Sequence, residues 1–392
     1  PGRGGHHQRP EGTDFPAKLI QDMPVRLGAG VDQLCREIRP LRAEVGTIKG
    51  RSAPAVSLVA SDGGNQGLSF DPFFVQLVRV VDSYGKNMFL DAVTPTSSID
   101  YLERAQFNGD GSPRSPVGRL MRDLGIRGTS LNAISPMIPS SRFARENPDK
   151  MSPSWVQVYR DLCEWAVLYE RICHGSFATD TLIVRDGLLR SKIFQQDYFI
   201  KMMDLVEAGI QRLYREDRRR IFLVGIAKRS KVLERYNLAL QIEEIFPAGD
   251  SVFVRIPREL EAKAYTWPEY ARGAEEEREG EKAKFVMGIM HFVRFGSRNG
   301  DPIWTVDMLP SQMERRAEVF GYLLSDAVEG FPVPFYPRCL QKAHEFARIA
   351  DFDLKILQDQ VTQAVRELLP LEKRAIIDGL ILQSDMGGGR YS

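Results

Sequence analysis

The sequence lacks any long uninterrupted run of apolar residues. Within its 392 residues, no stretch reaches the ~18 consecutive apolar residues that a membrane-spanning helix requires. The opening segment PGRGGHHQRP also lacks the apolar stretch of a secretory signal peptide. We therefore expect a cytoplasmic protein with no membrane partner.

Cysteine is scarce, and neither sign of charge is in excess. The chain has four cysteines, scattered without CxxC spacing: Cys35, Cys163, Cys173 and Cys339. We expect buried free thiols of a reducing compartment, not a disulfide framework or a zinc site. The 53 Lys and Arg against 52 Asp and Glu give a formal net charge of +1. This balance excludes a histone-like protein held on nucleic acid by bulk charge, but it allows a local basic surface.

Strand-like and helical segments alternate through a chain long enough for two or three domains. Three strand-like segments come first, at 56–64, 73–85 and 87–93, and a Gly pair after Asp62 is expected to end the first. Further strands are expected at 180–187, 221–227, 251–257, 285–295 and 302–308, and helices at 31–38, 155–173, 192–216, 231–242, 313–328 and 337–369. The alternation predicts an α/β fold. We divide the chain into an N-terminal arm and helix (1–50), a central domain (51–350) with a loop-rich insertion (94–150), and a C-terminal helix and flexible tail (351–392).

Three acidic residues occupy positions where a charge needs a partner. Asp62 and Asp186 lie near strand ends on the parity of the apolar residues, and each precedes a glycine. A carboxylate there is unfavourable unless it is paired or bound to a cation, although Asp-Gly is also ordinary turn chemistry. Glu170 falls inside the apolar arc of helix 155–173, so we expect it to point toward the sheet; the alternatives are snorkelling or pairing with a buried arginine. Glu164 falls on the polar face and is expected at the surface.

The order of these acids along the chain is typical of one fold. Three sequential strands carry Asp62 on the first, a helix carries Glu170, and a fourth strand ends at Asp186. This is the order of the ribonuclease H-like fold, a mixed sheet flanked by helices. Carboxylates of this kind suit Mg²⁺ or Mn²⁺, and two ions about 4 Å apart can promote phosphodiester hydrolysis. The sequence therefore predicts a shared metal site.

As a set, the motifs resemble the NurA family of DNA nucleases. In chain order they are LVASDGG, the helix bearing Glu170, LIVRDGLL, VGIAKRS and FPVPFYPRCLQKAHEFARIA. The resemblance covers about 56–350 and implies a metal-dependent nuclease, Mn²⁺-preferring, that acts on DNA ends and on single strands. It also implies a ring-like homodimer that works with a HerA-type hexameric ATPase, in DNA repair or in defence against foreign DNA. The chain departs from the family where Asp62 is followed by Gly-Gly instead of Gly-Ser, and where Asp186 is followed by Gly-Leu-Leu; the acids themselves are kept.

The resemblance also places functional roles on Lys228, Tyr336 and His344. Pro337 suits the first position of a helix, so we expect Tyr336 at its N-terminal boundary and His344 at least half-buried. Eight helical residues span ~12 Å, so the two side chains cannot contact one atom. We expect His344 at the catalytic water or scissile phosphate, and Tyr336 at a neighbouring phosphate or base. Two other histidines carry no such role: His174 is expected to cap a helix and His291 to be packed or to face solvent.

A basic segment offers a surface for DNA. Residues 212–235 contain nine Lys and Arg against three acids, a local charge of +6. This predicts salt-sensitive phosphate binding, above all by Lys228, Arg229 and Lys231, with a solvated charged face as the alternative. The acidic stretch 274–282 is expected to be a solvated loop.

Two other functions compete with a nuclease. An actin-like or sugar-kinase ATPase shares the three-strand opening and an Asp-Gly motif, but it needs a second Gly-rich phosphate loop, and GGGR at 387–390 has no following helix. A catalytically silent DNA-clamp subunit is the other alternative. The presence of Glu170, Asp186 and His344 argues against a subunit that has lost its catalytic residues.

Overall fold

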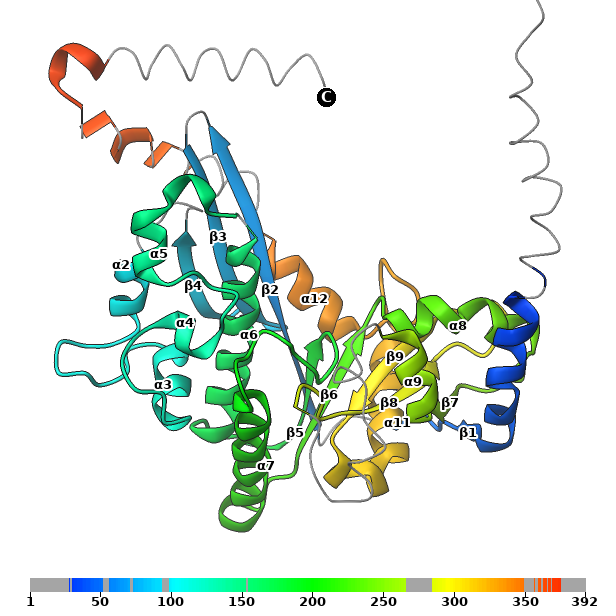
Figure 1. Ribbon diagram of the computed structural model, residues 1–392. Helices are drawn as coiled ribbons and strands as arrows, with labels where there is room; N and C mark the ends of the chain where they lie inside the picture. The colour runs from blue at the N-terminus through cyan, green and yellow to red at the C-terminus, as the bar shows by residue number, and fades with distance from the viewer. Residues whose placement is uncertain are drawn as a thin grey trace, which may run out of the picture.

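The computed structural model in Figure 1 describes most of the chain between residues 28 and 374. The described ranges are 28, 30–51, 56–70, 73–93, 99–152, 154–265, 284–348, 356, 359–360, 362–364, 366–367 and 369–374, with the backbone alone for 56–70, 73–77 and 148. The predicted acidic loop at 274–282, the GGGR motif and the flexible tail lie outside these residues. No helix of the described residues is long and apolar enough to cross a membrane.

Strands of the described chain form one mixed sheet in the order β1-β7-β8-β9-β6-β5-β2-β3-β4. Their bounds are β1 Gly46–Thr47, β2 Val56–Phe70, β3 Phe73–Asp82, β4 Asn87–Val93, β5 Asp180–Asp186, β6 Ile221–Ala227, β7 Val252–Arg255, β8 Ile289–Arg294 and β9 Ile303–Met308. The neighbours β2, β5 and β6 run parallel, and the other pairs are antiparallel. The predicted α/β class is confirmed.

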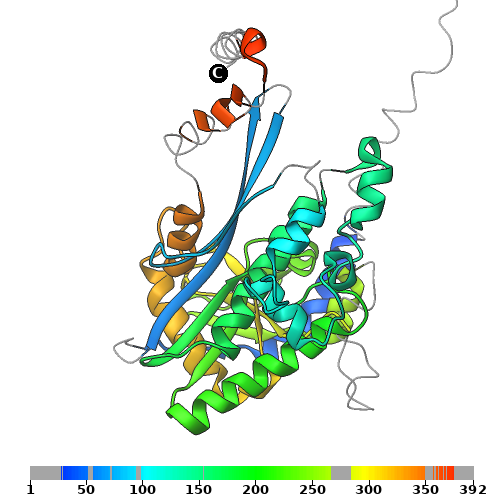
Figure 2. The ribbon, with the colours of Figure 1, turned by 90° about the vertical axis from the view of Figure 1, so that its left-hand side faces the viewer.

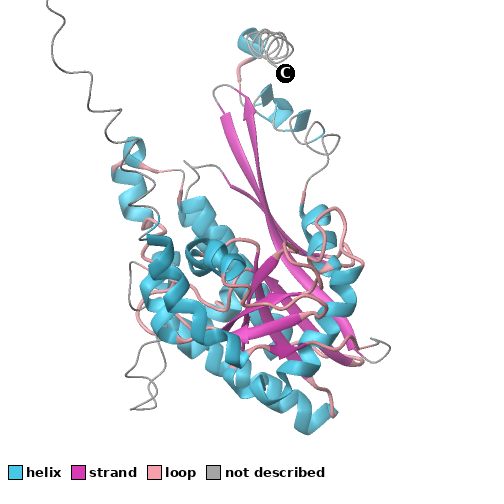
Figure 3. Cartoon of the chain, turned by 90° about the vertical axis from the view of Figure 1, so that its right-hand side faces the viewer, coloured by secondary structure: helices cyan, strands magenta, loops and turns pink. Residues whose placement is uncertain are grey.

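The first three long strands form the expected antiparallel meander. The turn between β3 and β4 is fixed by Asp82, whose Oδ1 accepts backbone N–H groups from Tyr84 and Lys86, both at 3.0 Å. The prediction that β2 stops at its Gly pair is wrong. Gly63 and Gly64 pair with β3, and the strand continues to Phe70 because its backbone partners persist. The resulting long hairpin extends beyond the rest of the sheet (Figures 2 and 3).

Helices cover both faces of the sheet. Their bounds are α2 Ile99–Ala105, α3 Pro116–Asp123, α4 Leu131–Ile134, α5 Ser141–Glu146, α6 Trp155–Cys173, α7 Tyr198–Asp217, α8 Lys231–Ile242, α9 Arg258–Ala264, α11 Arg316–Val328 and α12 Arg338–Ala347, with short 3₁₀ turns η1 Arg39–Glu44, η2 Pro148–Lys150, η4 Pro310–Arg315 and η5 Leu371–Lys373. Successive strand residues face opposite sides. Ile183 of β5 packs with α6 and α7, whereas Leu182 and Val184 pack with α11 and α12.

Two helix boundaries differ from the prediction. The helix expected from residue 192 begins at Tyr198, because the preceding residues form a loop that returns to the sheet and is tied to β9 through Leu189. The helix expected to run from 337 to 369 ends at Ala347, where Arg348 takes an extended conformation. His174 caps α6 as predicted, and His291 is fully buried. The four cysteines are free thiols, of which Cys173 is the one that is partly exposed.

Candidate functional site

Three side chains from separate segments meet at the carboxyl edge of two parallel strands. Asp186 ends β5, and Lys228 directly follows β6, its parallel neighbour. The Lys228 Nζ atom lies 3.5 Å from Asp186 Oδ2. The Tyr336 hydroxyl donates to the other carboxylate oxygen, Oδ1, at 3.4 Å. One carboxylate thus has a cation on one oxygen and a phenol on the other.

Tyr336 is held rigidly. It is fully buried, and its ring packs edge-on against Trp304 with 4.8 Å between centroids. The Gln341 amide donates to the Tyr336 carbonyl at 2.8 Å, and the Trp304 indole donates to the carbonyl of Phe335 at 2.6 Å. Pro337 is the N-cap of α12, so Tyr336 does stand at the N-terminal boundary of that helix. The hydroxyl that reaches Asp186 is therefore presented by a preorganised segment.

Asp62 is adjacent to Asp186 in the sheet. Ser61 of β2 is the register partner of Arg185 in parallel β5, so the next residue on each strand, Asp62 and Asp186, stand level with one another. Neighbouring strands lie about 4.8 Å apart. The structure describes Asp62 through its backbone, and this places the two predicted acids side by side on adjacent strands, Asp186 at the end of β5 and Asp62 within β2.

His344 lies on α12, which packs across β2 (Figure 1). Its side chain is exposed, so the expectation of at least half-burial is wrong. The buried face of this helix is formed by Leu340, Ala343 and Ala347. At ~100° per residue His344 lies only ~40° around the helix from Leu340, so its exposure could not be predicted from its position on the helix alone.

Glu170 is placed differently from the expectation that it points toward the sheet. Its carboxylate pairs with Arg119 of α3 at 3.3 Å, and its side chain is 30% exposed. Arg185, the neighbour of Asp186 that faces the opposite side of the sheet, meets α6 through Asp161 at 2.8 Å. Helix α6 therefore covers the face away from Asp186. The expected alternative was a pair with a buried arginine; Glu170 does pair with an arginine, but Arg119 is 33% exposed, and the role of Glu170 as a metal ligand stays a prediction.

Glu164 corrects a second expectation about α6. It was predicted at the surface, yet it is 9% exposed and lies 3.5 Å from the buried Arg185 guanidinium. The reason is electrostatic: a guanidinium buried under Trp165, 4.1 Å from the ring, needs carboxylates beside it.

The donor set at this edge fits a divalent cation in part. No group of three His, Cys, Asp or Glu able to hold a metal occurs in the part of the chain whose side chains are described. Asp186 offers one carboxylate, the hard oxygen ligand that Mg²⁺ and Mn²⁺ prefer, and the backbone of Asp62 lies beside it on the adjacent strand. Lys228 balances the charge of Asp186 in the structure as it stands.

Several solved structures are similar to this chain, whereas no protein-family model and no curated protein sequence matches it. They are NurA nucleases. The NurA nuclease from Sulfolobus solfataricus shares 13% identity at a TM-score of 0.39, over 92% of this chain and 99% of its own. NurA bound to dAMP and manganese shares 11% at 0.37, over 92% and 99%, and NurA with manganese shares 13% at 0.38, over 90% and 99%. This is the family that the sequence motifs resemble.

The basic segment 212–235 does not form one patch. Arg212 to Arg220 lie before β6, and Lys228 to Lys231 lie after it. A seven-residue strand spans roughly 23 Å at ~3.3 Å per residue, so the segment supplies two separate basic surfaces. Lys228 and Arg229 are exposed at the Asp186 edge, while Lys231 pairs with Glu234 at 3.3 Å.

A buried ion cluster that the sequence reading missed fixes the loop after Asp186. Arg190 donates to both carboxylate oxygens of Asp307, at 3.0 and 3.1 Å, and to Glu261 at 3.1 Å. Leu189 N–H adds a bond of 3.1 Å to Asp307. Burial acts to lower the pKa of Arg190, but the two carboxylates outweigh it and raise that pKa. The signal was an aspartate inside the apolar strand PIWTVDM, where a charge requires a partner.

Proposed function

We propose that this chain is a metal-dependent DNA nuclease that hydrolyses phosphodiester bonds at the edge formed by Asp62, Asp186 and Lys228. The observation that carries the proposal is the meeting of Lys228 and Tyr336 on the carboxylate of Asp186 at the ends of two parallel strands. This is a place where a phosphate would find a cation beside acids suited to divalent metal. The motif resemblance supports DNA as the substrate. One of the similar NurA structures is bound to dAMP and manganese, and we propose that this chain binds the same two classes of ligand, a nucleotide and a divalent metal.

Each residue has a separate task. Asp62 and Asp186 would hold the metal. When bound, Mn²⁺ or Mg²⁺ supplies activation of water and stabilisation of the leaving oxygen. The Tyr336 hydroxyl orients Asp186 through its hydrogen bond, and the Lys228 ammonium, 39% exposed, binds an oxygen of the scissile phosphate. His344, exposed on α12, gives or accepts a proton at the catalytic water or scissile phosphate.

The finer fold assignment is part of the proposal. Read outward from β6, the order β6-β5-β2-β3-β4 comprises two parallel strands followed by an antiparallel meander. This order supports a ribonuclease H-like core, extended on the other side of β6 by β9, β8, β7 and β1.

The resemblance adds expectations that we carry as proposals. They are two metal ions, a homodimer in the cytoplasm, a HerA-type hexameric ATPase as partner, and a role in end resection or anti-phage defence. Light scattering of the purified chain tests the dimer, and co-elution with the ATPase tests the partnership. Failure of either removes that statement and leaves the nuclease.

The decisive experiment measures cleavage of linear duplex and single-stranded DNA with Mn²⁺ and with EDTA. We expect Asp62→Asn and Asp186→Asn to lose at least about 100-fold in rate, with no activity in EDTA. Asp197→Asn is the matched control, because Asp197 is a 58% exposed aspartate at the start of α7. Equal cleavage by wild type and Asp186→Asn would overturn the site. DNA binding without cleavage would favour the silent clamp, and ATP hydrolysis by the purified chain would favour the kinase-like ATPase.

A further inference from the structure

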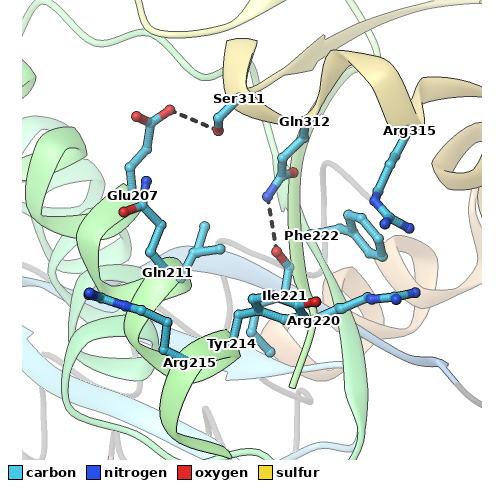
Figure 4. Close-up of a pocket in the computed structure, with 11 residues that line it drawn as sticks. Glu207, Gln211, Tyr214, Arg215, Arg220, Ile221, Phe222, Ser311, Gln312 and Arg315 are labelled. Carbon is cyan, nitrogen blue, oxygen red and sulfur yellow. Dashed lines mark hydrogen bonds between the residues drawn. The ribbon is translucent and has the colours of Figure 1, made fainter. Parts of the chain in front are cut away.

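A second basic surface contains a pocket of about 460 Å³ at the opposite end of β6 from Lys228. Residues of α7, the start of β6 and η4 line it (Figure 4). Gln312 fixes its floor: the amide donates to the Ile221 carbonyl at 2.9 Å, and its oxygen accepts from Leu223 N–H at 3.0 Å. The pocket is therefore a preformed feature of the fold.

Its charge is available to an external anion. Three arginines and one glutamate are among the lining residues: Arg215, Arg220, Arg315 and Glu207. Arg315 already pairs with Glu318 at 3.1 Å, and Glu207 accepts a hydrogen bond from Ser311. The guanidinium groups of Arg215 and Arg220 make no ion pair or hydrogen bond with the described part of the chain.

The pocket also has an aromatic wall. Tyr214 is 47% exposed, which is high for so large an aromatic side chain, and buried Phe222 also lines the pocket. In Figure 4, Arg215 extends to one side of Tyr214, and Arg220 extends to the other. Cations on either side of an exposed aromatic ring are the combination with which proteins hold single-stranded nucleic acid, phosphates on the cations and a base on the ring.

We propose that this pocket binds a single strand of nucleic acid, with Arg215 and Arg220 on successive phosphates and Tyr214 stacked on a base. Arginines on both sides of the ring match the phosphates that flank a base in a strand, whereas a mononucleotide carries its phosphate on one side. The pocket lies roughly 23 Å from Lys228, the length of seven-residue β6, so it is a contact remote from the cleavage edge. The choice of nucleic acid rests on the proposed nuclease function.

The test measures anisotropy of a fluorescent single-stranded oligonucleotide against salt, in EDTA, with the full chain. Arg215→Gln/Arg220→Gln removes two phosphate contacts, so we expect the slope of log K against log salt to become shallower by about 1.4, at ~0.7 per contact. Arg218→Gln/Arg219→Gln is the matched control: it removes the same charge from neighbouring arginines that do not line the pocket, and its slope should stay unchanged. Tyr214→Ala should weaken binding by about 5-fold or more.

Equal slopes for the two double variants would overturn the proposal, as would absence of oligonucleotide binding by the wild type. Competition by dAMP as effective as by an oligonucleotide would show a mononucleotide site and also overturn it. Because binding is measured without metal, its result does not depend on whether the chain cleaves DNA. If the wild type binds the oligonucleotide with the expected salt dependence but cleaves no DNA, the proposed pocket still stands. If it cleaves DNA fully but the two double variants have equal salt slopes, only the proposed pocket is overturned.

Discussion

The Nζ atom of Lys228 lies 3.5 Å from Asp186 Oδ2 and 5.0 Å from the centroid of the Tyr336 ring. The ammonium therefore contacts a carboxylate and an aromatic face at once, and both attract a cation. Its side chain is still 39% exposed. Lys228 is thus fixed in place at the edge of the sheet while its charge stays open to an incoming phosphate.

Replacing this lysine should impair cleavage without unfolding the protein. We expect Lys228→Gln to reduce kcat/KM on single-stranded DNA by about 10- to 100-fold, because the scissile phosphate loses its fixed positive charge. Lys201→Gln is the control, since Lys201 is a 52% exposed lysine on α7 that pairs with Asp197 at 3.3 Å. Similar rates for the two variants would contradict a role for Lys228 at the phosphate.

The Tyr336 hydroxyl can be removed with little change in packing. Tyr336→Phe keeps the ring against Trp304 and deletes the hydrogen bond of 3.4 Å to Asp186. We expect kcat to fall about 10-fold with KM unchanged, and the free energy of unfolding to change by no more than ~1.5 kcal/mol. Tyr322→Phe, which deletes a hydroxyl bond of 3.2 Å to Glu318 on α11, should leave kcat unchanged. A loss of stability with normal kcat would assign the hydroxyl to folding instead.

Glu170 can be tested through its partner. The pair with Arg119 is about one-third exposed on both sides, so we expect Glu170→Gln and Arg119→Gln each to cost less than ~1 kcal/mol of stability. Since α6 covers the face away from Asp186, both variants should retain most of the cleavage rate. The opposite outcome is that Glu170→Gln loses as much cleavage activity as Asp186→Asn while Arg119→Gln keeps it. That result would show that Glu170 is the third metal ligand predicted from the sequence.

The case of Glu170 shows where a helical wheel stops being informative. The sequence predicted the bounds of α6 correctly, because its apolar period is strong, but 12 of its 19 residues are buried. The sheet takes one side of this helix, and α3 from the insertion takes another. An apolar arc on a helical wheel cannot show which neighbouring element, the sheet or another helix, a given residue contacts. The insertion 94–150, for which the sequence offered no role, supplies the arginine that pairs with Glu170.

The ends of β5 and β6 were predicted more successfully. Placing Asp186 and Lys228 at the ends of 180–187 and 221–227 needed only the apolar runs, and parallel neighbours then bring them together. The basic segment was interpreted as one surface because its residues are consecutive, yet a strand in its middle carries its halves to opposite edges. Local pattern located the ends of β5 and β6 but not the end of β2, which continues to Phe70 through its pairing with β3, and it could not show the distance between the two ends of β6.

His291 should make stability depend on acidity. It is fully buried on β8 against the rings of Phe253 and Phe320, with Nδ1 3.0 Å from the Ile289 carbonyl oxygen. Burial lowers its pKa to about 4, and the positive charges of Arg255 and Arg316 act in the same direction. In the unfolded chain a histidine titrates near ~6.5.

Because the folded pKa is the lower one, the unfolded state takes up the proton first as the pH falls. The contribution of neutral His291 is therefore complete above pH ~6.5 and is lost progressively down to about 4. At ~1.36 kcal/mol per pH unit the full loss is of the order of 3 kcal/mol. Urea unfolding at pH 7.5 and at pH 4.5 measures it: the wild type should lose about 2–3 kcal/mol more than His291→Leu, which cannot titrate. Parallel losses in the two proteins would show that His291 accepts its proton within the fold without penalty.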